Sequence, residues 1–202
     1  AKLGREANLL SGSLSYEGMK KAIETGEGLA GTIEFFPEEG KYHFDGHRKC
    51  HICMSPAEAD RNDGICPVCK RKMTIGVSHR IDQLADREEG FVLSDGKPFE
   101  SLVPLPEVIA ASTGRSAAGK RVQEEYQSML DKLGTEFAIL REVPIEDIRG
   151  HSGYLIAEGI RRLREGRVTR LPGFDGEYGI IRLFEPDEIQ NPEGQMSLSG
   201  IL

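Results

Sequence analysis

The chain has 202 residues, of which 38% are hydrophobic and 29% charged, and it carries a formal net charge of −7. This length favours two or three compact units, and the acidic balance argues against a protein that coats nucleic acid with its whole surface. No apolar run approaches the roughly 18 residues that a membrane span needs, and the first ten residues lack a signal-peptide core, so we expect a cytoplasmic protein without a membrane partner.

The first 89 residues have the composition of a β-rich lobe. In chain order, we expect a helix over residues 15–24, strands over 31–36, 41–45 and 72–78, and a short helix over 79–85. Ser13 or Ser15 is a suitable N-cap for the first helix. Pro37 and Gly40 separate the first two strands, so we expect these strands to pair as a hairpin.

Helical patterns dominate after residue 104. In chain order, we expect a turn-rich bridge over 90–96, helices over 106–111 and 117–133, a strand or extended link over 137–143, helices over 144–148 and 154–164, and β structure over 168–184 around a turn at 172–176. The final residues are rich in Pro, Gly, Asn and Ser, which is typical of a loosely held tail.

Four cysteines form two C-x-x-C pairs, Cys50 with Cys53 and Cys66 with Cys69, and twelve residues separate the pairs. Zinc favours four soft ligands in a tetrahedron, and two tight turns of this kind supply four thiolates while backbone N–H groups point at the sulfur atoms. Such a closed shell leaves no position for water or substrate. We therefore expect one structural Zn²⁺ that stabilises the fold and takes no part in catalysis.

Other uses of these cysteines are weaker interpretations. Disulfides suit small secreted domains, and a redox dithiol requires a C-x-x-C at the start of a helix. An iron site of the rubredoxin kind usually has an aromatic shell, whereas this chain has no tryptophan. His43, His47 and His51 could be spare ligands or catalytic bases, although a surface or hydrogen-bonded histidine is the more ordinary role.

Basic residues flank the cysteine pairs, namely Arg48, Lys49, Lys70, Arg71 and Lys72. Between residues 41 and 80, eight Lys and Arg stand against four acids, which makes this stretch locally +4 in an acidic chain. The contrast predicts contact with phosphates. The alternative is that these charges only keep the turns soluble.

Residues 145–170 approximate the helix-hairpin-helix pattern, in which a glycine-bearing turn lends backbone N–H groups to a DNA phosphate. Gly153 is the glycine of the predicted turn. The candidate DNA contacts that follow it are Arg161, Arg162, Arg164 and Arg167. The alternative is an ordinary amphipathic helix with a solvated face.

Residues 114–120 match the phosphate-loop pattern G-x-x-x-x-G-K, but Arg121 stands where a magnesium-binding Ser or Thr is required. A predicted helix, and not a strand, also precedes the pattern. We therefore expect no ATP site here. Lys120 and its glycines could instead open a helix toward a nucleic-acid backbone.

Together these patterns predict an α+β protein in three parts. A β-rich zinc-binding region with a small zinc-ribbon-like lobe spans 1–89 and contains the zinc knuckles at 50–69. A helical, helix-hairpin-helix-like DNA-binding region with terminal β-strands spans 90–188, and a loosely ordered tail spans 189–202.

Several segments resemble the C-terminal half of the endonuclease Q family: residues 31–50, the two knuckles, residues 103–107 and residues 172–176. The likeness runs to about residue 188. In that family an N-terminal PHP metal domain cuts DNA on the 5′ side of deaminated bases and of abasic sites. Residues 3–7 resemble the stretch just after the last metal motif of the PHP domain. The resemblance thus implies a piece of a longer protein, with its catalytic residues upstream of residue 1.

The resemblance implies the zinc-stabilised, DNA-binding part of a repair hydrolase, with damaged duplex DNA and the upstream PHP domain of the same full-length chain as its partners. We expect no catalytic residue within this chain. One alternative is an adaptor that docks on the missing domain or on another repair protein. Another is residual hydrolase activity that uses His43 or His47.

Overall fold

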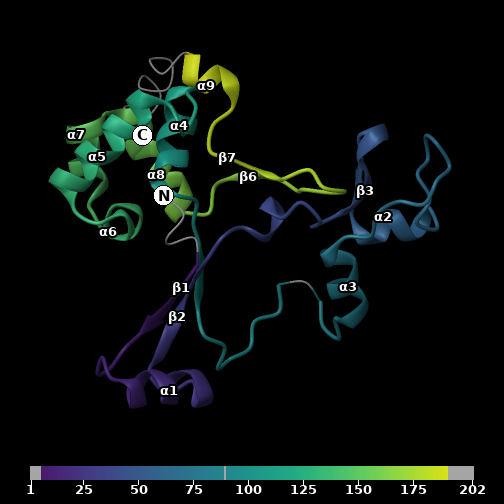
Figure 1. Cartoon of the computed structure of the whole chain (residues 1–202), viewed down its shortest axis with the longest axis horizontal. Coiled ribbons are helices and arrows are strands. Elements are labelled where there is room, and N and C mark those ends of the chain that lie inside the picture. The colour runs from purple at the N-terminus through teal and green to yellow at the C-terminus, as the bar shows by residue number, and fades with distance from the viewer. Residues whose placement is uncertain (1–5, 89, 191–202) are drawn as a thin grey trace, which may run out of the picture. The chain divides into compact units, whose positions relative to one another are not determined.

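The computed structural model describes residues 6–88 and 90–190 and is a mixed α+β protein, as the sequence predicted (Figure 1). Its strands are β1 (Ala7–Leu10), β2 (Leu29–Glu34), β3 (Asp45–His47), β4 (Ile52–Met54), β5 (Phe99–Ser101), β6 (Thr169–Leu171) and β7 (Ile180–Arg182). Its helices are α1 (Tyr16–Thr25), α2 (Pro56–Arg61), α3 (Val77–Leu84), α4 (Leu105–Thr113), α5 (Lys120–Leu133), α6 (Glu136–Arg141), α7 (Ile145–Ser152), α8 (Tyr154–Arg164) and α9 (Pro186–Gln190), with 3-10 turns η1 (Pro37–Glu39) and η2 (Arg48–Cys50).

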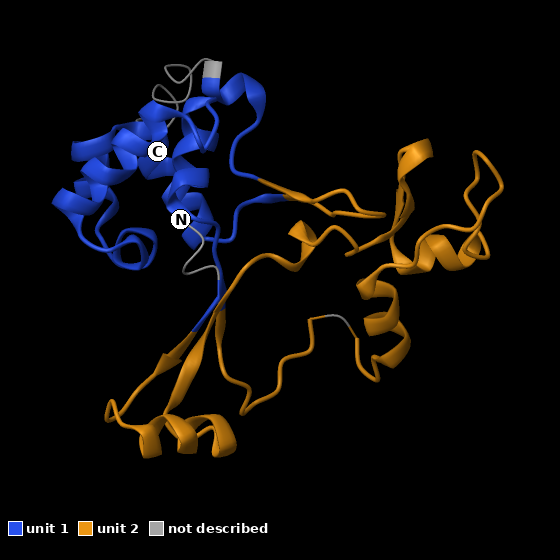
Figure 2. Cartoon of the chain, viewed as in Figure 1, with its two compact units in different colours: residues 1–7, 100–169, 182–202 blue, residues 8–99, 170–181 orange. Residues whose placement is uncertain are grey.

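The chain divides into two compact units (Figure 2). The first, which we call the helical unit, takes the described residues of 1–7, 100–169 and 182–202. The second, the knuckle unit, takes residues 8–99 and 170–181. From the sequence we expected one region over 90–188. In the structure, residues 170–181, which include the turn of the β6–β7 hairpin, are part of the knuckle unit. The backbone N–H of Phe44 donates to the carbonyl of Gly173 at 3.0 Å, a long-range pairing that local sequence patterns do not encode.

The helical unit has an apolar core supplied by one face of each of its main helices. Its most deeply buried side chains are Leu105, Val108, Ile109, Val122, Met129, Ile139, Leu140, Ile148 and Ile160. Burying each of these contributes roughly 1.5–3 kcal/mol relative to exposure. A single residue, Gly153, joins α7 to α8 with a positive φ of 84° that favours glycine. The predicted helical hairpin is therefore present.

Helix α6 lies where the sequence predicted a strand or extended link. Thr135 caps its N-terminus by accepting from the backbone N–H of Ala138, and Glu136 lies in its first turn. Ile139 and Leu140 are buried on its inner face. A six-residue segment has little tendency to form a helix by itself, so the packing of these two side chains is what stabilises α6.

The predicted hairpin of residues 31–36 with 41–45 is wrong. β2 lies between β1 and β5 in a three-stranded sheet, and β3 pairs antiparallel with β4. Residues 41–43 form a turn, and the N–H of Gly176 donates to the carbonyl of Lys41 at 2.8 Å. The Lys41 carbonyl, which a hairpin would pair with the strand over 31–36, is thus hydrogen-bonded to Gly176 instead.

Among the described helices, none is long and apolar enough to cross a bilayer. The predicted tail over 189–202 lies outside the described residues, except for its first two positions at the end of α9.

Candidate functional site

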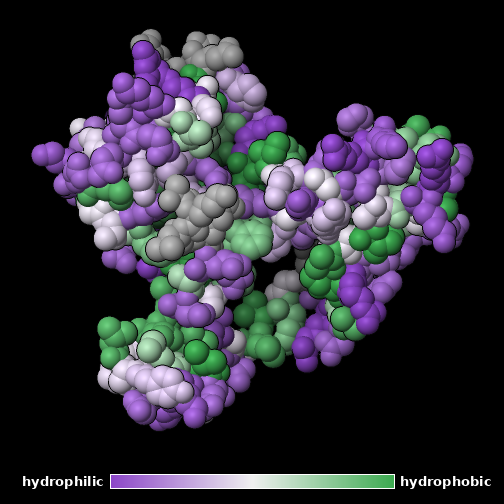
Figure 3. All heavy atoms as spheres, viewed as in Figure 1, coloured by the Kyte–Doolittle hydropathy of each residue, from purple (hydrophilic) through white to green (hydrophobic). Residues whose placement is uncertain are grey.

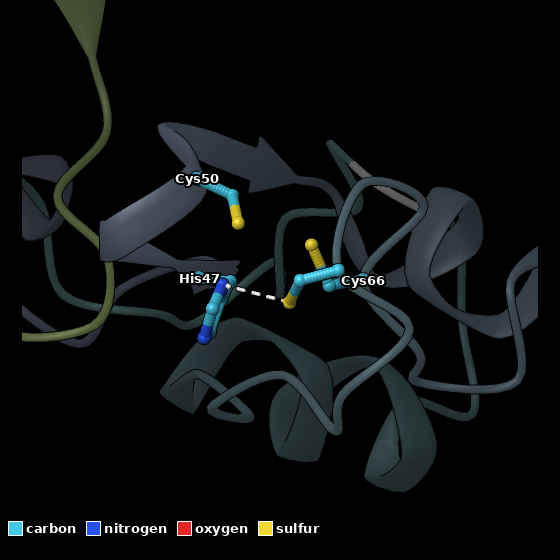
Figure 4. A group of neighbouring side chains, drawn as sticks. His47, Cys50 and Cys66 are labelled. Carbon is cyan, nitrogen blue, oxygen red and sulfur yellow. Dashed lines mark hydrogen bonds between the residues drawn. The ribbon is translucent and has the colours of Figure 1, made fainter.

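Four possible metal ligands converge in the knuckle unit. Nδ1 or Nε2 of His47 and the sulfur atoms of Cys50, Cys66 and Cys69 all lie within 4.8 Å of one another. Figure 4 shows the side chains of His47, Cys50 and Cys66 pointing toward a common centre. His47 Nδ1 lies 3.5 Å from Cys69 Sγ, and Cys66 is fully buried. Three of the four predicted ligands are thus brought together, and a histidine joins them.

Strand register explains why His47 is in this group. In the antiparallel pair β3–β4, His47 is opposite Ile52 and Gly46 is opposite Cys53. Cross-strand partners share one face of a sheet, and neighbours along a strand point to opposite faces. Ile52 and Met54 pack on the small core beneath the ligand group. His47 therefore shares the ligand-bearing face, and Cys53 points to the other face.

In this structure the group differs from the predicted quartet at Cys53. The Cys53 side chain is exposed, and its sulfur lies 3.9 Å from the carbonyl oxygen of Pro172. Gly46, on the same face, backs onto the ring of Phe174, and a Cβ at Gly46 would overlap that ring. The turn of the β6–β7 hairpin thus packs on this face at Gly46 and leaves the neighbouring Cys53 side chain exposed.

The donor set fits a structural zinc ion. A tetrahedron with Zn–S bonds of about 2.3 Å separates its ligand atoms by roughly 3.8 Å. This spacing suits donor atoms that all lie within 4.8 Å of one another, with 3.5 Å between His47 Nδ1 and Cys69 Sγ. Burial raises the pKa of the Cys66 thiol, but N–H groups of Cys69 and Val68 donate to its sulfur and the net shift of this pKa is downward. Burial and the neighbouring thiols raise the pKa of Cys50 to about 11. A bound cation would relieve this mutual repulsion of thiolates.

A buried acid–histidine pair supports the strand that carries His47. The Asp45 carboxylate is fully buried, lies 2.6 Å from His79 Nδ1 and accepts from the backbone N–H of Gly76 at 2.6 Å. The hydrogen bond to Asp45 raises the pKa of His79 more than burial lowers it. Sequence reasoning missed this pair. The only signal was an acid in a stretch otherwise typical of a strand.

A second carboxylate fixes the turn that carries Cys50. Asp175 accepts from the backbone N–H of Arg48 at 2.7 Å and from the Thr74 hydroxyl at 2.6 Å. These two hydrogen bonds hold the pKa of Asp175 below its usual range. The predicted turn at 172–176 therefore braces the start of η2.

The basic residues around the cysteine turns are exposed: Arg48, Lys49, Lys70, Arg71 and Lys72. Arg48 Nε lies 3.4 Å from the Glu177 carboxylate. Lys70 has a φ of 61°, so this turn holds a side chain in the left-handed region that glycine favours. The structure thus presents cations on both cysteine turns.

The arginines after the hairpin are engaged within the helical unit. Arg164 donates to the carbonyls of Ile139, Leu140 and Val143 at 2.9, 2.9 and 2.7 Å, which satisfies the C-terminal end of α6. Arg162 is largely buried, with hydrogen bonds to Glu158, Glu188 and the carbonyl of Leu183. We therefore propose neither Arg162 nor Arg164 as a DNA contact.

Arg161 and Arg167 form ion pairs with Glu158, a carboxylate that is almost fully buried, yet about half of each arginine side chain stays exposed. Gly153 is exposed and faces open space. Lys120 begins α5 directly after its N-cap Gly119, lies 3.6 Å from Glu124 and is exposed. A phosphate loop would need a strand directly before it, whereas helix α4 precedes this segment.

Residues 104–167 match a family model described as the MJ0043 C-terminal domain. The uncharacterized protein MJ0043 of Methanocaldococcus jannaschii is 30% identical over 204 residues, which cover 94% of this chain and 24% of that protein.

Two solved structures are similar over nearly the whole chain. The lesion-specific endonuclease PfuEndoQ from Pyrococcus furiosus has a TM-score of 0.81 and 31% identity, covering 100% of this chain and 50% of that one. Endonuclease Q in complex with a 27-mer duplex carrying an abasic lesion has a TM-score of 0.76 and 31% identity, covering 93% of this chain and 47% of that one. The resemblance to part of endonuclease Q is confirmed, and this chain spans about half the length of these solved relatives.

Proposed function

We propose that this chain is the DNA-binding part of a DNA-repair endonuclease that cleaves 5′ of deaminated bases and abasic sites. The observation that carries the proposal is the similarity of the whole chain, at 31% identity, to a lesion-specific endonuclease. A relative of the same fold binds a duplex with an abasic lesion at its active site. The chain spans about half of each relative, so the proposal assigns DNA cleavage to a PHP domain in the other half.

In this proposal the cysteine turns contact the phosphate backbone. Lys49 and Arg48 extend from η2 beside Cys50, and Lys70 to Lys72 extend from the second cysteine turn. Each phosphate that a cation neutralises releases counterions, so the observed affinity must fall with salt. Residues 145–164 add a helical hairpin whose turn at Gly153 faces open space, where a phosphate can approach backbone N–H groups.

The metal in this proposal is a structural zinc ion held by Cys50, Cys66, Cys69 and a fourth ligand. The spacing of the cysteines predicts Cys53 as this fourth ligand, whereas the geometry of the structure favours His47. A bound zinc ion would join the two cysteine turns into one rigid surface. The four donors form a closed shell, so the ion stabilises folding and does not activate water.

Catalysis by the chain alone is not part of the proposal. His47 lies among the thiols, and the His43 ring stacks on that of Phe44 with centroids 5.1 Å apart. Burial lowers the pKa of His43. We expect the purified chain not to nick duplex DNA in the presence of divalent metal ions, and metal-dependent nicking would restore the hydrolase alternative.

A salt series tests the proposal. We expect the zinc-loaded chain to bind a labelled 27-mer duplex with an abasic site, and its log affinity to fall linearly with log salt. The Lys72→Glu variant should bind more weakly and show a salt slope that is smaller by about 1. Lys132→Glu, which makes the same charge change at an exposed site on α5, is the matched control. Binding that is absent, or that is independent of salt, overturns the proposal.

A second candidate function, docking on the rest of a longer chain, rests on an apolar surface over α1. Leu14 is 94% exposed and Ile23 is 75% exposed, and Figure 3 shows hydrophobic residues gathered over this lobe. Single exposed apolar residues are ordinary, but a cluster of them marks an interface. The solved relatives have about as much chain outside the matched part as within it, so that remaining half is the occupant that we propose.

Association in trans tests the docking candidate. The remaining half, produced as a separate polypeptide, should bind this chain, and Ile23→Asp should weaken that binding. Ile81→Asp, at an exposed isoleucine on α3, is the matched control. Equal association of both variants and of the native chain would remove α1 from the interface.

A further inference from the structure

Two exposed tyrosines flank one lysine on the knuckle unit. Tyr178 is 72% exposed and Tyr42 is 49% exposed. The ammonium group of Lys41 lies 5.0 Å from the centroid of the Tyr178 ring, and Tyr42 follows Lys41 in the chain. The Tyr42 hydroxyl lies 3.7 Å from the position that a Cβ on Gly176 would occupy. Both rings therefore project near the turn of the β6–β7 hairpin.

The backbone beneath these rings is tightly held. The N–H of Gly173 donates to the carbonyl of Glu38 at 2.8 Å, and the N–H of Gly176 donates to the carbonyl of Lys41 at 2.8 Å. A Cβ on Gly179 would overlap the carbonyl oxygen of Glu38, so the two segments approach as closely as glycine permits. The rings thus stand on a preorganised base, which lowers the entropic cost of binding.

A cation lies close to each tyrosine: Lys41 over the Tyr178 ring, and Arg48, whose Nη1 lies 3.9 Å from the Gly176 Cβ position that the Tyr42 hydroxyl also approaches. Arg48 and Arg170 are exposed, and they lie 3.4 Å from the Glu177 carboxylate and 3.2 Å from the Glu38 carboxylate, respectively. The nearby acids are thus partly neutralised within the protein, while Lys41 lies over an aromatic face. Aromatic rings interleaved with cations are the arrangement that proteins use to hold unpaired nucleotides, because bases stack on the rings and phosphates meet the charges.

We propose that Tyr42 and Tyr178 form a stacking platform for nucleobases that a lesion leaves exposed in duplex DNA. This inference rests on the proposed function and adds the part of the DNA that this face recognises. A missing or damaged base exposes a face of its neighbour and lowers the cost of unstacking, so a platform discriminates damaged from intact duplex without reading sequence. Lys41 and Arg48 contact the phosphates beside the stacked base.

The test compares tyrosine variants on two duplexes of one sequence, one with an abasic site and one fully paired. Tyr178→Ala and Tyr42→Ala should each weaken binding to the abasic duplex by about 5- to 150-fold, the range for losing one base–aromatic stack. Tyr178→Phe keeps the ring and should stay within about twofold of the native chain, since stacking needs the π face alone. Tyr16→Ala, at a 70% exposed tyrosine on α1, is the matched control.

The salt slope separates stacking from phosphate contact. Tyr178→Ala should lower the affinity at every salt concentration without changing the slope, in contrast to Lys72→Glu. A 2-aminopurine next to the abasic site should change its fluorescence with the native chain and not with Tyr178→Ala. Circular dichroism establishes that each variant is folded.

The outcomes distinguish this inference from the proposed function. If the native chain binds DNA and both alanine variants bind the abasic duplex as tightly as the native chain does, the platform is overturned and the proposed function stands. Equal losses on the intact and abasic duplexes would overturn the preference for lesions. Failure of the native chain to bind any duplex would overturn both proposals.

Discussion

The fourth ligand of the metal group gives the sharpest prediction, because spacing and geometry name different residues. If the geometry is right, Cys53→Ser removes an exposed thiol whose sulfur lies 3.9 Å from the Pro172 carbonyl oxygen. Such a change is worth less than about 0.5 kcal/mol, and zinc affinity should not change. His47→Asn, by contrast, removes one of four converging donors.

The size of the His47→Asn effect follows from the free energy shared among the donors. Structural zinc sites contribute about 10–16 kcal/mol, so one of four donors accounts for roughly 2.5–4 kcal/mol. At 1.4 kcal/mol for each factor of ten, zinc affinity should fall by about 60- to 700-fold. His51→Asn is the matched control, because His51 is exposed and asparagine tolerates its φ of 52°.

The assay is competition for zinc against a chelator of known affinity, together with the absorption spectrum of the cobalt-substituted protein. Three thiolates with one imidazole and four thiolates give different cobalt spectra. The native spectrum should persist in Cys53→Ser and change in His47→Asn. The reverse result, with zinc lost from Cys53→Ser and retained by His47→Asn, would refute the argument from strand register and support the four-cysteine site.

Three further predictions concern stability, each followed by urea unfolding of the zinc-loaded chain. Arg164→Ala should lower the free energy of unfolding by about 2–4 kcal/mol, because three carbonyls at the end of α6 lose a charged donor. A loss below about 1 kcal/mol would contradict the capping role. Burial raises the pKa of Glu158, but hydrogen bonds from Arg162 and Arg161 lower it by more, so the net shift is downward. The contribution of Glu158 to the free energy of unfolding is therefore present above pH 4.5 and is lost as the pH falls through the lowered pKa. Glu158→Gln should reduce this loss of stability at acid pH, and an unchanged loss would exclude Glu158 as its source. The pKa of His79 is raised, so its contribution is complete below pH 6.5 and lost as pH rises through the raised pKa. His79→Gln should abolish this loss, and an unaltered loss of stability at rising pH would contradict the role of His79.

Much of the architecture was predictable from local patterns. The Ser15 cap marks α1, and apolar spacing marks α5 and α8. Gly153 joins α7 and α8 as the hairpin pattern predicted. These features depend on contacts within one or two helical turns, and the sequence records such contacts directly.

Charge counts predicted less about the arginines. The run after Gly153 suggested a phosphate-binding surface, but Arg162 and Arg164 are engaged by Glu188 and by carbonyls of α6. These partners lie more than twenty residues away along the chain. A sequence records the sign of each charge and not the group that folding places beside it.

The sequence by itself determined that two cysteine turns come together as a group of soft donors that could hold a metal ion. Only the tertiary structure decided which four side chains face each other, because strand register turns His47 toward the thiols and Cys53 away from them. The same holds for the 172–176 turn, which lies more than a hundred residues from the first cysteine and yet braces it through Asp175. Side-chain direction and long-range pairing are set when segments pack, and no local pattern contains them.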